Sequence, residues 1–278
     1  MILEILYFHT SMEKLYKDNP GKEDLLTLLD AIFDIGYENL QKLRGEVAPE
    51  DDHGVYFLGI LTRATVFSDD LFNILYRTRS GCFTSVYILG RCIMDDYIRL
   101  EYVLRSGDPL EEIHNIDAEA MKKNLHKIEE LVDVNNNVYG GKFPFYPTSA
   151  KMAEVREAIF NRKDADKYIV DRKASTPATM KFKGQKSLSQ MAVDAGRKVD
   201  DDIARAYYFW RLWSDYVHFA PSSFTMEAEN MKDIPTLYKN LQEIFYYLYR
   251  NLRQVLRFFI KEREYKPVDS KGLYRLIE

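Results

Sequence analysis

The sequence predicts an all-α fold, a single domain in which several helices pack as a bundle. Apolar residues recur at helical spacing along most of the 278 residues, as they do where one face of each helix is buried. The 13 glycines and 9 prolines are few and cluster between these periodic segments. No long stretch alternates apolar and polar residues, so a core of strands is not expected. These observations favour a bundle of about six or more helices.

Residues 1–50 are expected to form a helical hairpin. A helix is predicted over 2–18, because asparagine, proline and glycine follow it and end its pattern. A second helix is predicted over 23–44, where leucine and isoleucine recur at helical spacing. A loop over 45–54 then leads into the core of the bundle, which is expected to span 54–264.

The next two predicted helices belong to the centre of the bundle. Residues 56–76 are apolar on most faces, which is typical of a well-buried helix. Residues 82–105 carry a single apolar stripe, and a Ser-Gly-Asp-Pro sequence ends that helix. The stripe consists of Cys82, Val86, Leu89, Ile93, Tyr97, Leu100 and Leu104. After this break the helical pattern resumes and continues to about Val134.

Residues 135–187 are expected to form a long, irregular, basic excursion from the bundle. Its first part is rich in asparagine, glycine and proline, which is typical of a loop. Thr148 or Ser149 can cap a short helix that ends near Phe160. Residues 161–187 are weakly patterned, and their lysines and arginines exceed their aspartates by five. Such a segment is either a solvated loop or a contact for the RNA backbone.

Two strongly patterned helices are expected to close the chain, over 200–219 and 233–264. Pro235 fits the second, because proline is tolerated in the first turn of a helix. Residues 250–266 hold an excess of four basic residues, and tyrosines lie next to them. These tyrosines can stack on bases, although such residues are more often part of a core.

Composition and charge limit the classes of function. The net charge of −4 argues against binding nucleic acid through the overall field, but it leaves local basic patches open. No stretch approaches the ~20 apolar residues of a membrane span, and the N-terminus lacks the basic region of a signal peptide. Cys82 and Cys92 are therefore expected to be reduced, buried thiols of a cytoplasmic protein.

The predicted helix over 200–219 carries polar residues on a face that the core does not need. Its buried side consists of Ala206, Phe209, Trp210, Trp213 and Val217. A second line of residues, which we call the polar stripe, is spaced i, i+4, i+7 and i+11 and consists of Tyr207, Arg211, Ser214 and His218.

The polar stripe combines residue types suited to cleaving a phosphodiester without a metal. His218 can take the proton from a ribose 2′-hydroxyl or return one to the leaving oxygen. Arg211 can stabilise the charge that builds on the phosphorane, because its fork geometry matches phosphate. Ser214 can hydrogen-bond the imidazole or the substrate. No phosphate loop and no zinc-site spacing occurs in the sequence, so neither a cofactor nor a metal is expected.

The spacing within the polar stripe predicts a homodimer. Seven helical residues separate the Cα atoms of Arg211 and His218 by about 10 Å. Helical side chains lean toward the N-terminus, so Arg211 tends to point away from His218. A second helix or a second chain must then complete the site. A two-fold dimer meets this need, because its interface brings the same stripe together twice.

Arg211 and His218 resemble the R-x(4–6)-H motif of the HEPN superfamily, and the similarity extends over about residues 54–260. The segment also resembles bacterial families of unknown function that carry an S-x-x-V-H-P-like motif. In those families an earlier helix carries an R-x-x-x-E/D pattern, which Arg91 and Asp95 match. The chain differs from the usual HEPN nuclease at Leu212, where a polar residue is common.

The resemblance implies an all-α fold and suggests a function. Many HEPN proteins are metal-independent endoribonucleases that act as dimers in toxin, anti-phage or RNA-processing roles, and others are non-catalytic. It implies that Arg211 and His218 are the catalytic pair. It also implies that RNA and a partner or antitoxin protein are candidate partners.

A non-catalytic helical interaction protein is the alternative. Arg211 and Asp215 are spaced for an i, i+4 ion pair on the helix surface. His218 can contact the last carbonyls of its helix. Arg91 and Asp95 are expected to pair within their own helix, whereas the functional alternative is that Asp95 orients a basic group of the polar stripe.

Overall fold

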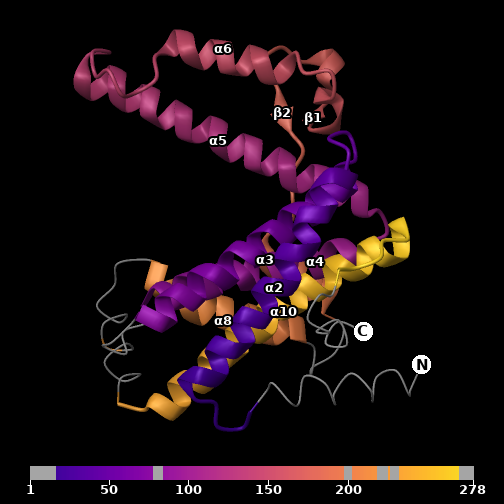
Figure 1. The fold of residues 1–278 in the computed structure, drawn as a ribbon. Helices are drawn as coiled ribbons and strands as arrows, with labels where there is room; N and C mark the ends of the chain where they lie inside the picture. The colour runs from indigo at the N-terminus through magenta and orange to yellow at the C-terminus, as the bar shows by residue number, and fades with distance from the viewer. Residues whose placement is uncertain (1–16, 78–83, 197–201, 218–224, 226–231, 269–278) are drawn as a thin grey trace. The chain divides into compact units, whose positions relative to one another are not determined.

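The structure, a computed structural model of the chain, confirms an all-α fold built from packed helices (Figure 1). It describes residues 17–77, 84–196, 202–217, 225 and 232–268. The strands found among these residues are two residues long and pair as a small antiparallel ribbon. None of the described helices combines the length and apolar character needed to cross a bilayer. The helix predicted over 2–18 lies almost wholly outside the described residues.

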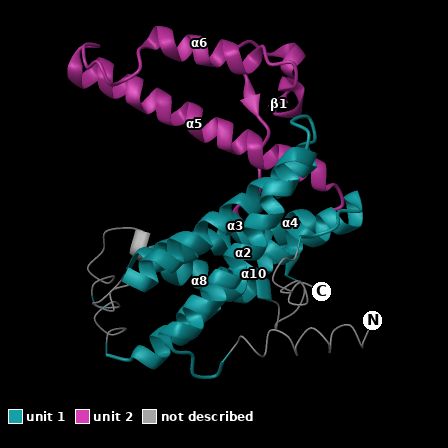
Figure 2. Ribbon diagram, viewed as in Figure 1, with its two compact units in different colours: residues 1–104, 188–278 teal, residues 105–187 magenta. Residues whose placement is uncertain are grey.

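The chain divides into two compact units (Figure 2). Unit 1 consists of residues 1–104 and 188–278, and unit 2 consists of residues 105–187. The sequence pattern predicts one domain with an excursion over 135–187. The inserted unit begins earlier than this, and it contains two helices of its own.

Three long helices pack against one another in unit 1: α2 (Lys22–Glu46), α3 (Asp52–Arg77) and α10 (Ile234–Arg263). They approach one another closely at Gly36. A Cβ atom there would lie 2.5 Å from Thr65 Oγ1 and 3.2 Å from Leu252 Cδ1. Glycine is needed at this position, because a side chain would force the helices apart.

α3 is less buried than the sequence pattern predicts. Its inward side is buried at Phe57 and Leu61, where it packs on α2 and α10. Val55, Val66 and Tyr76 are 45%, 49% and 65% exposed. The prediction of burial on most faces was wrong, because apolar residues also occur singly on ordinary protein surfaces.

The described part of unit 1 also contains α4 (Thr84–Arg105), α7 (Leu188–Ala195) and α8 (Asp202–Val217). The predicted stripe of α4 is buried at Val86, Ile93, Tyr97 and Leu100. Leu104 is 36% exposed, and Cys82 lies outside the described residues. α7 is absent from the sequence-based prediction, because eight residues are too few to establish a helical period.

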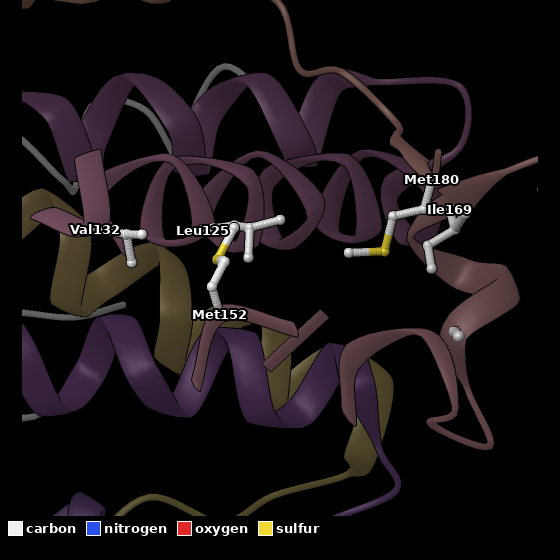
Figure 3. Packing of buried hydrophobic residues seen from close by; sticks show 6 residues of the cluster. Leu125, Val132, Met152, Ile169 and Met180 are labelled. Carbon is white, nitrogen blue, oxygen red and sulfur yellow. The ribbon is translucent and has the colours of Figure 1, made fainter. Parts of the chain in front are cut away.

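Unit 2 is built on α5 (Pro109–Tyr139) and α6 (Ser149–Phe160). Strands β1 (Ile169–Val170) and β2 (Lys181–Phe182) pair in the segment that follows α6. A small core holds these elements together (Figure 3). It consists of Leu125, Val132, Met152, Ala165, Ile169 and Met180. The sequence pattern predicts an irregular segment here. Buried apolar side chains near each of the two strands hold it in place.

The loop predicted from residue 135 begins later, because α5 continues through Tyr139. Asn135 is 1% exposed, and its Oδ1 accepts a hydrogen bond from the Phe143 backbone N–H at 3.1 Å. Its Nδ2 donates to the carbonyls of Phe143, Tyr146 and Pro147, each at 3.4 Å. These tertiary bonds offset the poor helix propensity of asparagine. α5 then ends at Gly140, whose φ of 59° suits glycine.

Candidate functional site

α8, which carries the polar stripe, packs against α4 within unit 1. Trp213 is buried beside Tyr87, with ring centroids 5.9 Å apart, and it stacks on Phe209. Gly90 of α4 faces this contact, since a Cβ atom there would lie 3.2 Å from the Trp213 ring and 2.8 Å from Ile244 Cδ1. The two helices that carry the predicted site residues therefore meet.

Arg91 of α4 reaches directly across to α8. Its guanidinium carbon lies 4.8 Å from the centre of the Trp210 ring, which is a cation–π contact. Its Nε donates a hydrogen bond to Ser214 Oγ at 3.1 Å. Ser214 Oγ in turn donates to the Trp210 carbonyl at 2.7 Å. The hydroxyl proton of Ser214 is therefore engaged within α8, and this residue links the two helices.

The ion pair predicted between Arg91 and Asp95 is not formed. Asp95 instead accepts hydrogen bonds from Arg99, at 2.8 Å from Nε and 3.4 Å from Nη2. An acidic residue four positions before a basic one is the better orientation on a helix, and Asp95 has that relation to Arg99. Arg91, which precedes Asp95, has the poorer orientation and binds α8.

The polar stripe does not present one uniform face. Tyr207 is half-buried and stacks on Trp210, with ring centroids 5.7 Å apart. Arg211 is exposed and forms no hydrogen bond or ion pair with any residue that the structure describes. Tyr208, next to it on the outer side of α8, is 62% exposed. His218 and the side chain of Asp215 lie outside the described residues.

The N-terminal end of α8 is fixed by a polar network with α10. Arg250 forms an ion pair with Asp202 at 3.0 Å and donates to Tyr246 Oη at 3.0 Å. It also donates to Tyr97 Oη at 3.4 Å. Tyr247 Oη donates to the Asp202 carbonyl at 3.0 Å. α8 is thus tied to α10 at its beginning and to α4 near its end.

The basic surface predicted for the last helix is partly internal. Burial alone lowers the pKa of Arg250, but Tyr97, Tyr246 and Asp202 together raise it above its ordinary value. Burial, with neighbouring Arg257, lowers the pKa of Arg253 to about 9. Tyr247 and Tyr249 are buried, so they belong to the core and are not free to stack on bases.

A buried carboxylate on α4 escaped the sequence-based prediction. Asp96 is buried, and burial raises its pKa to about 6 although Arg63 Nε donates to it at 2.7 Å. Burial likewise raises the pKa of the adjacent Cys92 thiol. Arg63 is itself 49% exposed, so its place in an apolar helix does not predict a buried anionic partner, and the pair arises only when α3 and α4 pack together.

Stability is expected to fall as the pH rises through the raised pKa of Asp96. Between pH 3.8 and about 6 the folded chain holds a proton that the unfolded chain has released. The extra stability is therefore complete below pH 3.8 and is lost above about pH 6, an effect of about 3 kcal/mol, of which about 2 kcal/mol is lost between pH 4.5 and pH 7.5. Urea denaturation of the wild type and Asp96→Asn at pH 4.5 and 7.5 measures it. Identical pH dependence in the two proteins contradicts the prediction.

Comparison with known proteins identifies one family model. The model described as "Family of unknown function (DUF5677)" matches residues 55–233, well over half of the chain. This segment begins in α3 and includes both α4 and α8, which carry the site. No curated protein and no solved structure matches the chain.

Proposed function

The chain belongs to DUF5677, a family of unknown function, and we propose that it acts as a metal-independent endoribonuclease of the HEPN type. The observation that carries this proposal is that the Arg211 side chain is exposed and has no described ion-pair partner. It lies on a helix that is otherwise firmly attached. An arginine in this state is available to bind phosphate.

The attachment of α8 supports a binding role for its exposed side. The helix is held near one end by Asp202 and near the other by Ser214. A functional side chain is more effective on a rigid element, because less entropy is lost when it engages a ligand. Arg211 lies between these two attachments, so its backbone position is well determined.

In the proposed reaction, the substrate's own ribose supplies the nucleophile. His218 removes the proton from a 2′-hydroxyl, and the resulting oxygen attacks the adjacent phosphorus. Arg211 stabilises the added negative charge on the phosphorane. The bond to the 5′-oxygen then breaks, and this oxygen receives a proton from a protonated histidine. The products are a 2′,3′-cyclic phosphate and a 5′-hydroxyl. A homodimer provides a second copy of the stripe, so that one histidine can act as base and the other as acid.

Cleavage of single-stranded RNA in EDTA tests the proposal. We expect His218→Ala and Arg211→Ala each to lower the rate by about a hundredfold or more, because each removes a group that acts in the transition state. The product ends should carry 2′,3′-cyclic phosphate. Tyr208→Ala is the matched control, since Tyr208 is also exposed on α8 but has no role in this mechanism. Equal cleavage by wild type and both variants rules the proposal out.

A non-catalytic helical interaction protein is the second candidate, and the hydrogen bonds of Ser214 favour it. Its hydroxyl is used to join α4 and α8, so this part of the polar stripe has a structural role. This candidate predicts no cleavage by the wild type. It also predicts weaker dimerisation or lower stability when Arg211 or His218 is truncated, which sedimentation and thermal unfolding measure.

A further inference from the structure

Arg91 presents an unused hydrogen-bonding edge at the junction of α4 and α8. One face of its guanidinium covers Trp210, and its Nε is bonded to Ser214. Neither of its Nη atoms forms a hydrogen bond or ion pair with a residue that the structure describes. The two contacts fix the orientation of the guanidinium plane and leave its terminal nitrogens to bind another group.

The described carboxylates next to Arg91 are already paired with other arginines. Asp95 is paired with Arg99, and Asp96 is paired with Arg63. Among these described residues of α3 and α4 there are three arginines and two carboxylates. Both carboxylates are paired with an arginine other than Arg91. Arg91 stabilises α8 only through a neutral hydroxyl and an aromatic ring. No described carboxylate neutralises Arg91, so a bound anion would complement its charge.

Trp210 adds a second observation at the same place. The indole Nε1 is buried and has no hydrogen-bond acceptor among the described residues. An unsatisfied buried donor costs about 1–3 kcal/mol, so a small movement of the Trp210 side chain that brings Nε1 to an acceptor gains that energy. Trp210 also directly precedes Arg211 in the chain. The residue that Arg91 covers is thus the chain neighbour of the exposed cation of the polar stripe.

We infer that the Nη edge of Arg91 binds a backbone phosphodiester of single-stranded RNA, next to the phosphate that Arg211 contacts. This inference rests on the proposed function for the identity of the ligand. Its chemistry is a bidentate arginine–phosphate contact, which a guanidinium held in a fixed plane forms at low entropic cost. Arg91 is a binding residue in this scheme and takes no part in proton transfer.

Binding is measured with the full chain carrying His218→Ala, in EDTA, so that cleavage does not consume the probe. The probe is a fluorescein-labelled oligouridylate, and its anisotropy is followed at several salt concentrations. We expect Arg91→Gln to weaken binding about tenfold. The slope of log affinity against log salt should fall by about 0.7, the value for one phosphate contact on a single strand. Arg91→Lys should keep the slope and lose affinity, because it keeps the charge but not the fork.

Arg99→Lys is the matched control. Arg99 lies on the same helix as Arg91, but its guanidinium is already paired with Asp95, so RNA affinity and salt slope should not change. Competition with inorganic phosphate tests whether the site prefers RNA or a free anion. Weak competition by millimolar phosphate supports the inference, whereas Arg91-dependent binding of phosphate without binding of the oligonucleotide overturns it.

The inference and the proposed function fail in different ways. If Arg91→Gln and Arg91→Lys both bind the oligonucleotide with the unchanged affinity and slope, the inference is wrong, whether or not the wild type cleaves RNA. If the wild type does not cleave but binding still depends on Arg91, the proposed function is wrong and the phosphate contact stands. Thermal unfolding of both variants shows whether lost binding reflects lost folding, and Arg91→Lys then provides the decisive measurement.

Discussion

Replacing Arg250 with methionine is expected to lower the free energy of unfolding of unit 1 by about 3 kcal/mol. Methionine keeps much of the apolar stem but removes the ion pair with Asp202 and the hydrogen bond to Tyr246. Asp202 then loses its cation, and the hydroxyl of Tyr97 loses a donor. Breaking one side of a partly buried pair costs more than the pair contributes, because the remaining charge stays poorly solvated.

Tryptophan fluorescence during urea denaturation measures this effect in unit 1. The chain has 2 tryptophans, and both Trp210 and Trp213 lie on α8. Arg263→Met is the matched control, because Arg263 is also on α10 but forms an exposed pair with Asp51, which should contribute less than about 1 kcal/mol. Adding Asp202→Asn to Arg250→Met should restore part of the loss. Equal destabilisation by Arg250→Met and Arg263→Met contradicts the prediction.

Asn135→Asp is expected to destabilise the loop between α5 and α6 by about 3 kcal/mol. The substitution removes the side-chain donor that faces the carbonyls of Phe143, Tyr146 and Pro147. It places a carboxylate oxygen against those carbonyl oxygens in a buried position, where an unpaired charge is costly. The bond that Oδ1 accepts from the Phe143 N–H does not offset this loss.

Hydrogen exchange of peptides from residues 139–148 measures the change in unit 2. Exchange there should accelerate by about a hundredfold, which corresponds to roughly 3 kcal/mol. Asn136→Asp is the control, because Asn136 is exposed and its side chain donates only to Ser149 Oγ. If both substitutions change exchange equally, Asn135 does not organise the loop.

Helix ends were predictable where the capping hydrogen bond joins residues close together in the sequence. Thr148 caps α6 as predicted, with Oγ1 accepting from the Lys151 N–H at 3.2 Å. Asp233 and Pro235 similarly mark the beginning of α10. In each case the cap and its partner are three residues apart, so the sequence contains the whole interaction. The end of α5 was mispredicted because the bonds of Asn135 reach across the loop that follows it.

The candidate site was predictable only as a set of residues on separate helices. The helical spacing of the polar stripe indicated α8 and its buried side, and Trp213 is buried as expected. The bond between Arg91 and Ser214 joins residues 123 positions apart, and no local pattern encodes such a contact. The choice of Arg99 as the partner of Asp95 was missed for a different reason. Both arginines lie four residues from Asp95, and only their direction along the helix distinguishes them.

The division of unit 1 into two chain segments has a consequence for its folding during synthesis. Residues 105–187 leave the ribosome as a continuous segment, so every partner within unit 2 is available before α8 has been made. α2 and α3 emerge early, but α10, which covers their apolar faces, is the last described helix to appear. Unit 2 can therefore fold first. The nascent first half of unit 1 exposes apolar surface for most of translation, and this is the stage at which chaperones are expected to bind it.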